Sequence, residues 1–392
     1  MSRTSAQPVL IAGGGIGGLA TAIALAQRDI PSVVYEKRND AHEAGAGIQI
    51  GPHGVKILRA LGLADILAPL AGVPEAIIVR NGGTGQVISR LPLGTWIEQR
   101  HGAPYWLLHR ADLHNALRAG ARQYPHIEVH SGTEVCNVTS AADNVTATLQ
   151  SQHHQTEVSG CALIGADGIG SAVRQTIAKQ CTPQLSQTSA ARAVFARPAI
   201  GVFAEPVVTL WLSQRSHVVH YPVRNGQEIS AVAFARDRDH HANLRPETGE
   251  ALVDRLGAAA PELTQALSAV TRWEKWPVAG WNRPAYAVSG RIALLGDAAH
   301  PIRPYLAQGA VMALEDAMAI SKHIAQAGND MPCALTSYAA QRLPRVARVA
   351  RTSYINGLSY HLPWPLSPMR NVVLSTIGGE RLMASYDWLY GA

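Results

Sequence analysis

A glycine-rich turn near the start of the chain constrains the fold more strongly than any other feature. Residues 8–12 are apolar, as in a short buried strand, and residues 19–27 have helical character. Between them stand Gly13, Gly15 and Gly18 in the G-x-G-x-x-G spacing. Glycines at these positions permit a tight turn, close approach of a pyrophosphate and close helix–strand packing, and the helix N-terminus stabilises the phosphate charge.

An acidic residue follows where such a unit needs one. Residues 32–35 form a second apolar strand, which ends in Glu36, 18 residues after Gly18. A carboxylate at this distance can accept hydrogen bonds from ribose hydroxyls. A glycine-rich turn alone can be purely structural, but the strand, helix and acid around this one favour dinucleotide binding.

Residues 291–317 predict a second ligand-binding turn. An apolar strand at residues 292–295 leads to Asp297, then to a loop with Pro304, and then to a helix that opens near Gly309. The acid can take hydroxyls, and the helix N-terminus offers free N–H groups and a partial positive charge. We interpret the ligand as a flavin nucleotide.

Other stretches predict contacts to the same ligand. Asp167 ends an alternating strand at residues 157–164, as a further strand-end carboxylate. The loop with Gly45, Gly47 and Gly51 can let the backbone approach a flat ring, or it can be a simple connection. Arg110 precedes a helix that we expect to begin with Asp112 as N-cap, so it can reach the flavin or be a solvated helix-end residue.

Residues 190–285 predict a second, β-rich domain. The runs VVTLWL, HVVHYPV and EISAVAF are typical of a meander, with an Asn-Gly turn before the last run. Strand alternation places His217, Val219 and Tyr221 on one face, and Val218 and His220 on the other. His217 and Tyr221 are candidate polar groups of an apolar pocket; solvent-facing positions on an edge strand are the alternative.

The remaining segments are predicted to be helical. Residues 247–270 form one long helix, residues 337–354 another, and residues 371–390 a terminal helix that packs on the body or on a second subunit. Four arginines recur every three residues in the middle segment, at Arg342, Arg345, Arg348 and Arg351. This spacing is typical of a solvated or partner-facing side.

Composition excludes several classes of protein. The 392 residues are 47% apolar and 16% charged, which indicates a globular protein. The net charge of +6 comes from scattered Lys and Arg, so we expect no nucleic-acid partner. The apolar runs are too short or interrupted to span a membrane. The chain has four isolated cysteines, Cys136, Cys161, Cys181 and Cys333. Isolated thiols fit the reducing cytoplasm. The absence of a Cys-x-x-Cys pair argues against a flavin–dithiol reductase, and the Cys and His spacings predict no metal site.

Three motifs in this order resemble those of a known family. GGGIGG with Glu36, GADGIGSAVR and LLGDAAHPIRPYLAQGA together are similar to the single-component FAD-dependent aromatic hydroxylases, which share the para-hydroxybenzoate hydroxylase fold. GAGIQIGPHG, YPVRNG and PYLAQGAVMALEDA are closest to the salicylate, 3-hydroxybenzoate and 6-hydroxynicotinate hydroxylases. The related halogenases carry a Trp-x-Trp-x-Ile-Pro motif, which Trp273 and Trp276 do not match in spacing.

The resemblance implies an α/β fold with α+β character in the second domain. A Rossmann-like FAD-binding domain is interleaved with a β-sheet substrate domain and followed by C-terminal helices. We expect the FAD-binding domain at residues 1–75, 106–189 and 286–325, the substrate domain at 76–105 and 190–285, and the helical segment at 326–392.

The resemblance also implies the cofactor contacts. The glycine-rich turn holds the pyrophosphate, Glu36 the adenosine ribose and Asp297 the ribityl hydroxyls. Asp167 serves both FAD and NAD(P)H, and Gly309 and Ala310 face the N1–C2=O edge of the flavin. The full implied set is Gly13, Gly15, Gly18, Glu36, Lys37, Gly47, Arg110, Val135, Asp167, Asp297, Pro304, Gly309 and Ala310.

The activity implied is that of a monooxygenase. NADH or NADPH reduces non-covalently bound FAD, O2 adds to give a C4a-hydroperoxyflavin, and OH passes to a small hydroxyaromatic or N-heteroaromatic acid. Some relatives have a His and a Tyr near His217 and Tyr221, in contact with the phenol, so these are the expected catalytic residues. The alternatives are a larger fused heteroaromatic or secondary-metabolite substrate, and a flavoprotein that does not hydroxylate. We expect a monomer or homodimer.

Overall fold

A computed structural model describes residues 7–39, 46–152, 154–179, 182–237, 245–281, 286–328 and 330–391. Gly45, Cys181 and the end of the predicted substrate domain, residues 282–285, lie outside these ranges. In the described part of the chain, every helix is too short or too polar to cross a bilayer.

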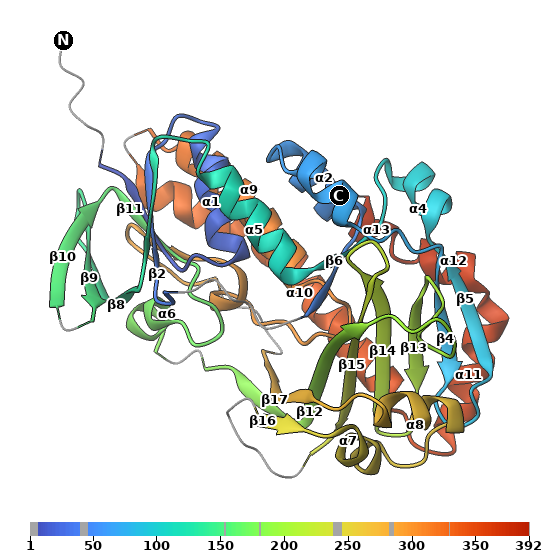
Figure 1. The fold of residues 1–392 in the computed structure, drawn as a ribbon. Helices are drawn as coiled ribbons and strands as arrows, with labels where there is room; N and C mark the ends of the chain where they lie inside the picture. Colours follow the sequence, from blue (N-terminus) through green and yellow to red (C-terminus); the bar gives the residue numbers. More distant parts are fainter. Residues whose placement is uncertain are drawn as a thin grey trace.

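A six-stranded sheet forms the first half of the fold, and five of its strands run parallel (Figure 1). In spatial order its strands are β18 (Val288–Ser289), β19 (Ile292–Leu294), β11 (Ala162–Gly165), β1 (Val9–Ala12), β2 (Ser32–Glu36) and β7 (Ile127–Ser131). The predicted strand–turn–helix–strand unit is therefore confirmed as β1, α1 (Ile16–Ala26) and β2.

Different layers cover the two faces of this sheet. Val9 and Ile11 of β1 pack toward the helices α1, α9 (Gly309–Ala325) and α10 (Met331–Tyr360). Leu10 and Ala12 pack toward a three-stranded antiparallel sheet, β8 (Thr133–Ser140), β9 (Val145–Ser151) and β10 (His154–Gly160). Helix α5 (Arg110–Ala121) lies beside α1 (Figure 1). The strand ends that carry Glu36 and Asp167 thus meet at one edge.

An eight-stranded sheet forms the second half. Its strands in spatial order are β16 (Arg245–Glu247), β17 (Trp273–Gly280), β12 (Gln184–Ala196), β15 (Glu228–Arg236), β14 (Ser216–Val223), β13 (Val208–Leu212), β4 (Ala76–Asn81) and β5 (Val87–Pro92). The predicted meander is confirmed as β13–β15. Two helices, α7 (Gly249–Leu256) and α8 (Pro261–Ser268), cover one face, where Trp211 and Trp273 are buried. One long helix does not form here because Gly257, at φ +78°, ends α7 and Pro261 begins α8.

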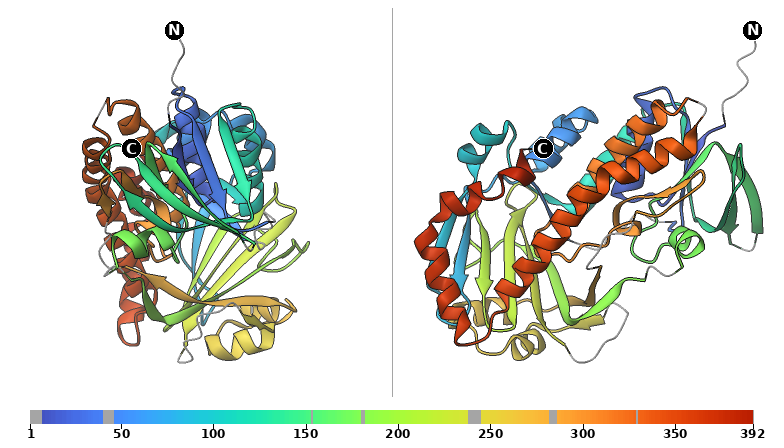
Figure 2. Two further views of the ribbon diagram at one scale, coloured as in Figure 1. Left: turned by 90° about the vertical axis from the view of Figure 1, so that its left-hand side faces the viewer. Right: turned by 180° about the vertical axis from the view of Figure 1, so that it is seen from behind.

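Helix α10 joins the two halves. In the right-hand view of Figure 2, seen from behind, it runs from the helices beside the six-stranded sheet toward the eight-stranded sheet. Three short helices follow, α11 (Leu366–Ile377), α12 (Gly379–Ala384) and α13 (Asp387–Tyr390), and the first two pack against β5. The prediction of one terminal helix was wrong because Gly378, at φ +81°, separates α11 from α12.

Short elements connect the halves or join longer elements within one half. They are β3 (Gly47–Ile50) paired with β6 (Trp106–His109), α2 (Pro52–Ala60), α3 (Ala64–Leu67), η1 (Ala68–Leu70), α4 (Gly94–His101), α6 (Ala172–Ile177) and η2 (Gly296–Ala298). The α/β class is confirmed. The assignment of residue ranges to domains remains a prediction.

Candidate active site

A cavity of about 670 Å³ lies between the strand ends of the six-stranded sheet and one face of the eight-stranded sheet. All but one of the predicted cofactor-binding and catalytic residues line it; the exception is Gly18. The fold therefore brings together residues from Gly13 to Ala310 that the sequence analysis assigned to one ligand and its substrate.

The glycine-rich turn has two tasks, which different glycines perform. Gly13 has φ +105°, and a Cβ on Gly18 would lie 1.9 Å from the carbonyl oxygen of Gly13, so these two glycines make the turn possible. A Cβ on Gly15 would meet no protein atom within 4 Å, although Gly15 lines the cavity. Gly15 therefore keeps space open for a ligand at the N-terminus of α1.

Glu36 is held rigidly at the end of β2. Its Oε2 accepts from the N–H of Gly14 at 2.8 Å, and its Oε1 accepts from the N–H of Arg38 at 3.0 Å. Lys37 and Val135 line the cavity nearby. The carboxylate is thus braced by the same turn that borders the phosphate position, as a ribose-binding acid requires.

Asp167 follows β11 and has an unsatisfied oxygen. Its Oδ2 accepts from the N–H of Val173 at 3.2 Å, whereas its Oδ1 is buried with no hydrogen-bond partner in the described residues. A buried carboxylate oxygen without a partner is costly. A ligand hydroxyl or N–H in the cavity would satisfy it.

Asp297 and the start of α9 face each other. Gly296, at φ +57°, turns the chain after β19 so that the exposed Asp297 lines the cavity. A Cβ on Gly309, the first residue of α9, would lie 3.9 Å from Oδ1 of Asp297. Pro304 and Ala310 line the cavity close by. The acid can bind hydroxyls where the helix N-terminus can stabilise negative charge.

Arg110 also lines the cavity, and its backbone N–H donates to the carbonyl oxygen of Ala46 at 2.8 Å. The prediction that Asp112 caps α5 was wrong. His109 is the N-cap, with Nδ1 accepting from the N–H of Ala111 at 3.2 Å, because the helix begins at Arg110.

These features fit FAD. The braced Glu36 suits the adenosine ribose of FAD, and the open space at Gly15 beside a helix N-terminus suits its pyrophosphate. The unsatisfied oxygen of Asp167, and Asp297 at a second helix N-terminus, suit the ribityl chain and the flavin. The described residues contain no cluster of three or more His, Cys, Asp or Glu side chains placed to bind a metal ion.

His217 lines the part of the cavity that the eight-stranded sheet forms, on the face of β14 that the strand alternation predicts. It is 3% exposed and stacks on Phe234 with ring centroids 4.3 Å apart. Burial lowers the pKa of His217 well below its usual value, so the imidazole is neutral. Its Nδ1 lies 2.7 Å from Nε2 of His361, at the C-terminal end of α10. His220 is on the opposite face, where it accepts from Nε1 of Trp211 at 3.0 Å.

Tyr221 lies on the same face as His217. Burial raises the pKa of Tyr221 to about 12, against hydrogen bonds to Ser230 and Gln49, which lower it. Gln49 also accepts from the hydroxyl of Tyr105 at 2.7 Å. Tyr221 is therefore a protonated phenol near neutral pH, and it can donate a hydrogen bond but is a poor base.

One wall of the cavity comes from the end of the chain, which the sequence analysis did not assign to the site. The residues concerned are Leu374, Leu382, Met383, Tyr386 and Tyr390. No sequence motif marks these residues or His361. These residues join the site only through the course of α10 and the turn at Gly378.

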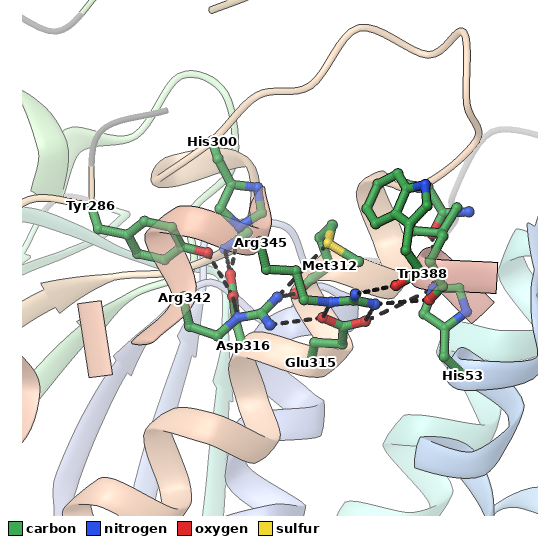
Figure 3. Close-up of polar contacts among 12 residues, drawn as sticks. His53, Tyr286, His300, Met312, Glu315, Asp316, Arg342, Arg345 and Trp388 are labelled. Carbon is green, nitrogen blue, oxygen red and sulfur yellow. Dashed lines mark hydrogen bonds and ion pairs between the residues drawn. The ribbon is translucent and has the colours of Figure 1, made fainter. Parts of the chain in front are cut away.

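A buried ion-pair cluster behind the cavity was also missed (Figure 3). Asp316 accepts from Nε of Arg342 and from the hydroxyl of Tyr286, each at 2.7 Å. Glu315 accepts from Arg342 at 2.7 Å and from Arg345 at 2.6 Å. The prediction of a solvated or partner-facing arginine side was therefore wrong for Arg342 and Arg345.

Comparisons with known proteins agree with this geometry. A family model described as an FAD binding domain matches residues 6–353. A 3-amino-4-hydroxybenzoate 2-monooxygenase of Streptomyces platensis is 36% identical, with 98% of this chain and 95% of the relative covered. A 3-hydroxybenzoate 6-hydroxylase of Polaromonas naphthalenivorans is 31% identical, with 98% and 96% covered. The structure of Klebsiella pneumoniae HpxO with FAD and uric acid has a TM-score of 0.85 at 26% identity, with 98% and 96% covered.

The fold and the site define an FAD-dependent oxidoreductase. The chain belongs to the family of FAD-dependent aromatic hydroxylases, and it is an FAD-dependent monooxygenase. The resemblance that the three motifs indicated is thereby confirmed.

Proposed function

We propose that this monooxygenase uses NADH or NADPH and O2 to hydroxylate a small aromatic or N-heteroaromatic acid that already carries a hydroxyl group. The observation that carries the proposal is the pair His217 and Tyr221, which line the apolar end of the cavity. The similar 3-hydroxybenzoate and 3-amino-4-hydroxybenzoate enzymes are named for substrates of this kind.

The cofactor end has a matching assignment. Gly13, Gly15 and Gly18 would hold the FAD pyrophosphate, Glu36 the adenosine ribose and Asp297 the ribityl chain. The N-terminus of α9 would face the flavin ring, where its partial positive charge stabilises an anion. When bound, FAD would carry electrons from NAD(P)H to O2 and so supply the activated oxygen for the hydroxylation.

His217 and Tyr221 would divide the proton chemistry. Because the imidazole of His217 is neutral, it can accept the phenolic proton, which makes the ring electron-rich. Because the phenol of Tyr221 keeps its proton, it can donate a hydrogen bond to the oxygen that results. The aromatic and apolar walls from α11 to α13 would exclude water during the transfer.

A larger fused heteroaromatic is the second candidate substrate. It is supported by the structural similarity to HpxO, whose structure was determined with uric acid. A small hydroxylated acid remains the favoured class because of the two benzoate-acting relatives, which match the chain over nearly its whole length.

The test measures product together with cofactor consumption. Purified, FAD-loaded protein is given NADH or NADPH with 3-hydroxybenzoate, 3-amino-4-hydroxybenzoate, 6-hydroxynicotinate or uric acid. We expect one of the three acids to accelerate NAD(P)H oxidation and to yield an equal amount of hydroxylated product. His217→Ala should lower the product rate about 100-fold or more, whereas His220→Ala should keep it. Oxidation that yields only peroxide with every compound would contradict hydroxylation, and product from uric acid alone would identify the second candidate.

A further inference from the structure

A second imidazole contacts the expected catalytic base from outside the cavity. Nδ1 of His217 and Nε2 of His361 are 2.7 Å apart, and the ring centroids are 4.9 Å apart. At this distance one nitrogen must carry the proton and the other must accept it. The residues are 144 positions apart in the chain, so tertiary structure alone brings them together.

The two rings differ in exposure. His217 is buried and lines the cavity, whereas His361 is partly exposed and is not among the described residues that line it. Nε2 of His217 has no hydrogen-bond partner in the described part of the chain, and it is not enclosed by protein atoms there. The pair therefore links a buried imidazole that lines the cavity to one that is partly exposed.

The groups around the pair keep it neutral. Burial lowers the pKa of His361 to about 4, with a further contribution from the Arg370 guanidinium. Phe234 of β15 and the phenols of Tyr305 and Tyr360 complete the surroundings. Burial raises the pKa of both phenols, so Arg370 of α11 is the charged group that faces the pair. Its guanidinium donates to the carbonyl oxygens of Ser359 and Tyr360.

We propose that His361 is a positioning residue that orients His217 and carries the substrate's phenolic proton from it to solvent. This inference rests on the proposed function, in which His217 accepts that proton. With His361 accepting at Nε2, His217 must carry its proton on Nδ1, which leaves Nε2 of His217 as the free base in the chamber.

The relay balances proton by proton. The substrate O–H bond breaks and the proton binds Nε2 of His217, while the proton on Nδ1 of His217 moves to Nε2 of His361. His361 releases its own Nδ1 proton to water. Both rings remain neutral with exchanged tautomers, and the substrate is a phenolate. The reverse transfers reprotonate the hydroxylated product and restore the starting tautomers.

His361→Gln separates relay from packing. The Gln amide oxygen can accept from Nδ1 of His217, but an amide cannot pass a proton onward. FAD-loaded oxidised protein is mixed in weakly buffered solution, in a stopped-flow instrument, with the product-forming compound among 3-hydroxybenzoate, 3-amino-4-hydroxybenzoate and 6-hydroxynicotinate. A pH indicator dye reports proton release, and the flavin spectrum reports binding. We expect His361→Gln to slow proton release about tenfold or more, with unchanged FAD content and ligand Kd.

Two control variants are matched to this test, one at His220 on the strand that carries His217 and one at His361 itself. His220→Gln, on the opposite face of β14, should release protons at the wild-type rate. His361→Ala should be as slow as His361→Gln, and added imidazole should restore part of its rate. Wild-type proton release in His361→Gln would overturn the relay, provided that His217→Ala is impaired. If His217→Ala is as active as the wild type, or if no compound yields product, the proposed function fails first.

A measurement on the wild type guards against a variant that does not fold. Nitrogen-15 NMR of histidine-labelled, substrate-free protein reports which ring nitrogen carries the proton. The proposal requires Nδ1–H on His217. Finding the proton on Nε2 of His217 would overturn it.

Discussion

Asp316 and Arg342 form an ion pair inside the protein, with Oδ1 and Nε 2.7 Å apart and side-chain exposures of 0% and 7% (Figure 3). The pair joins α9, whose first turn lines the cavity, to α10. Asp316 also accepts from the N–H of Gly296 at 3.0 Å and binds Nε2 of His300 at 2.5 Å. One buried carboxylate therefore fixes the turn that presents Asp297.

Removing the arginine should destabilise the fold. Arg342→Met leaves Asp316 as a buried charge that has lost its permanent cation, which typically costs about 3–5 kcal/mol of unfolding free energy. Arg351→Met, on the exposed side of the same helix, should change that free energy by no more than about 0.5 kcal/mol. Urea unfolding of both variants measures the difference; equal stabilities would mean that the pair is not a net support of the fold.

The four arginines show why the sequence placed some residues well and others poorly. An α-helix turns about 100° per residue, so steps of three drift by about 60° and carry the row from Arg342 to the opposite side at Arg351. The structure follows this drift: Arg342 is buried, Arg345 half-buried, and Arg348 and Arg351 exposed. The three-residue spacing therefore implies that the four arginines do not share one side of the helix. Which of them is buried depends on the side of the helix that faces the core, and the sequence does not show that side.

The predictable part of the site consists of local motifs. The glycine-rich turn, Glu36, Asp167 and Asp297 each lie at the end of a strand or within three residues of it, so sequence order and strand geometry suffice to place them. The pairing of His217 with His361, and the wall from Leu374 to Tyr390, arise from tertiary contacts between distant segments. No periodicity encodes such contacts, so the sequence could not show them.

Acid should weaken the fold before it protonates Asp316. Burial lowers the pKa of His53 to about 4 and that of His220 to about 3. Unfolded histidines titrate near 6.5, so between pH 6.5 and 4 the unfolded chain binds protons that the folded one does not. Stability is therefore present above pH 6.5 and is lost as the pH falls, by at most about 1.4 kcal/mol per pH unit for each imidazole.

Urea unfolding at pH 7, 5.5 and 4.5 measures this loss. His220→Gln should give a shallower slope because it removes one buried imidazole. Asp316 does not contribute in this window: burial raises its pKa, but His300 and Arg342 hold it at about 2, so its contribution is lost only below the unfolded value of 3.8. A flat profile from pH 7 to 4.5 would contradict the buried, neutral state of these histidines.

Substitutions in the glycine-rich turn should have two different effects, loss of FAD affinity at Gly15 and loss of stability at Gly18. Gly15→Val should keep the apoprotein's stability, since its Cβ meets no protein atom within 4 Å, yet weaken FAD binding tenfold or more, about 1.4 kcal/mol. Gly18→Ala should destabilise the apoprotein itself, because its Cβ would overlap the carbonyl of Gly13. Flavin fluorescence titration and thermal unfolding of both variants test this. Equal FAD affinity of Gly15→Val and wild type would contradict the assignment of the FAD pyrophosphate to this turn.

The contacts of Arg345 link α10 to the cavity lining that α13 supplies. Its guanidinium donates to the carbonyl oxygens of Trp388 at 3.2 Å and Leu389 at 3.0 Å, beside Tyr390, while Glu315 binds its other side. Hydrogen bonds from charged groups contribute about 1.5–3 kcal/mol each. Arg345→Gln should therefore loosen α13 and raise the KM for the aromatic substrate about tenfold, with little change in FAD affinity. Arg351→Gln, at an exposed position of the same helix, is the control. Steady-state kinetics at saturating NAD(P)H measure both constants. A fall in kcat with an unchanged KM would contradict the prediction, because it would show that Arg345 acts on the cofactor-binding end of the cavity through Glu315 and not on the lining from α13.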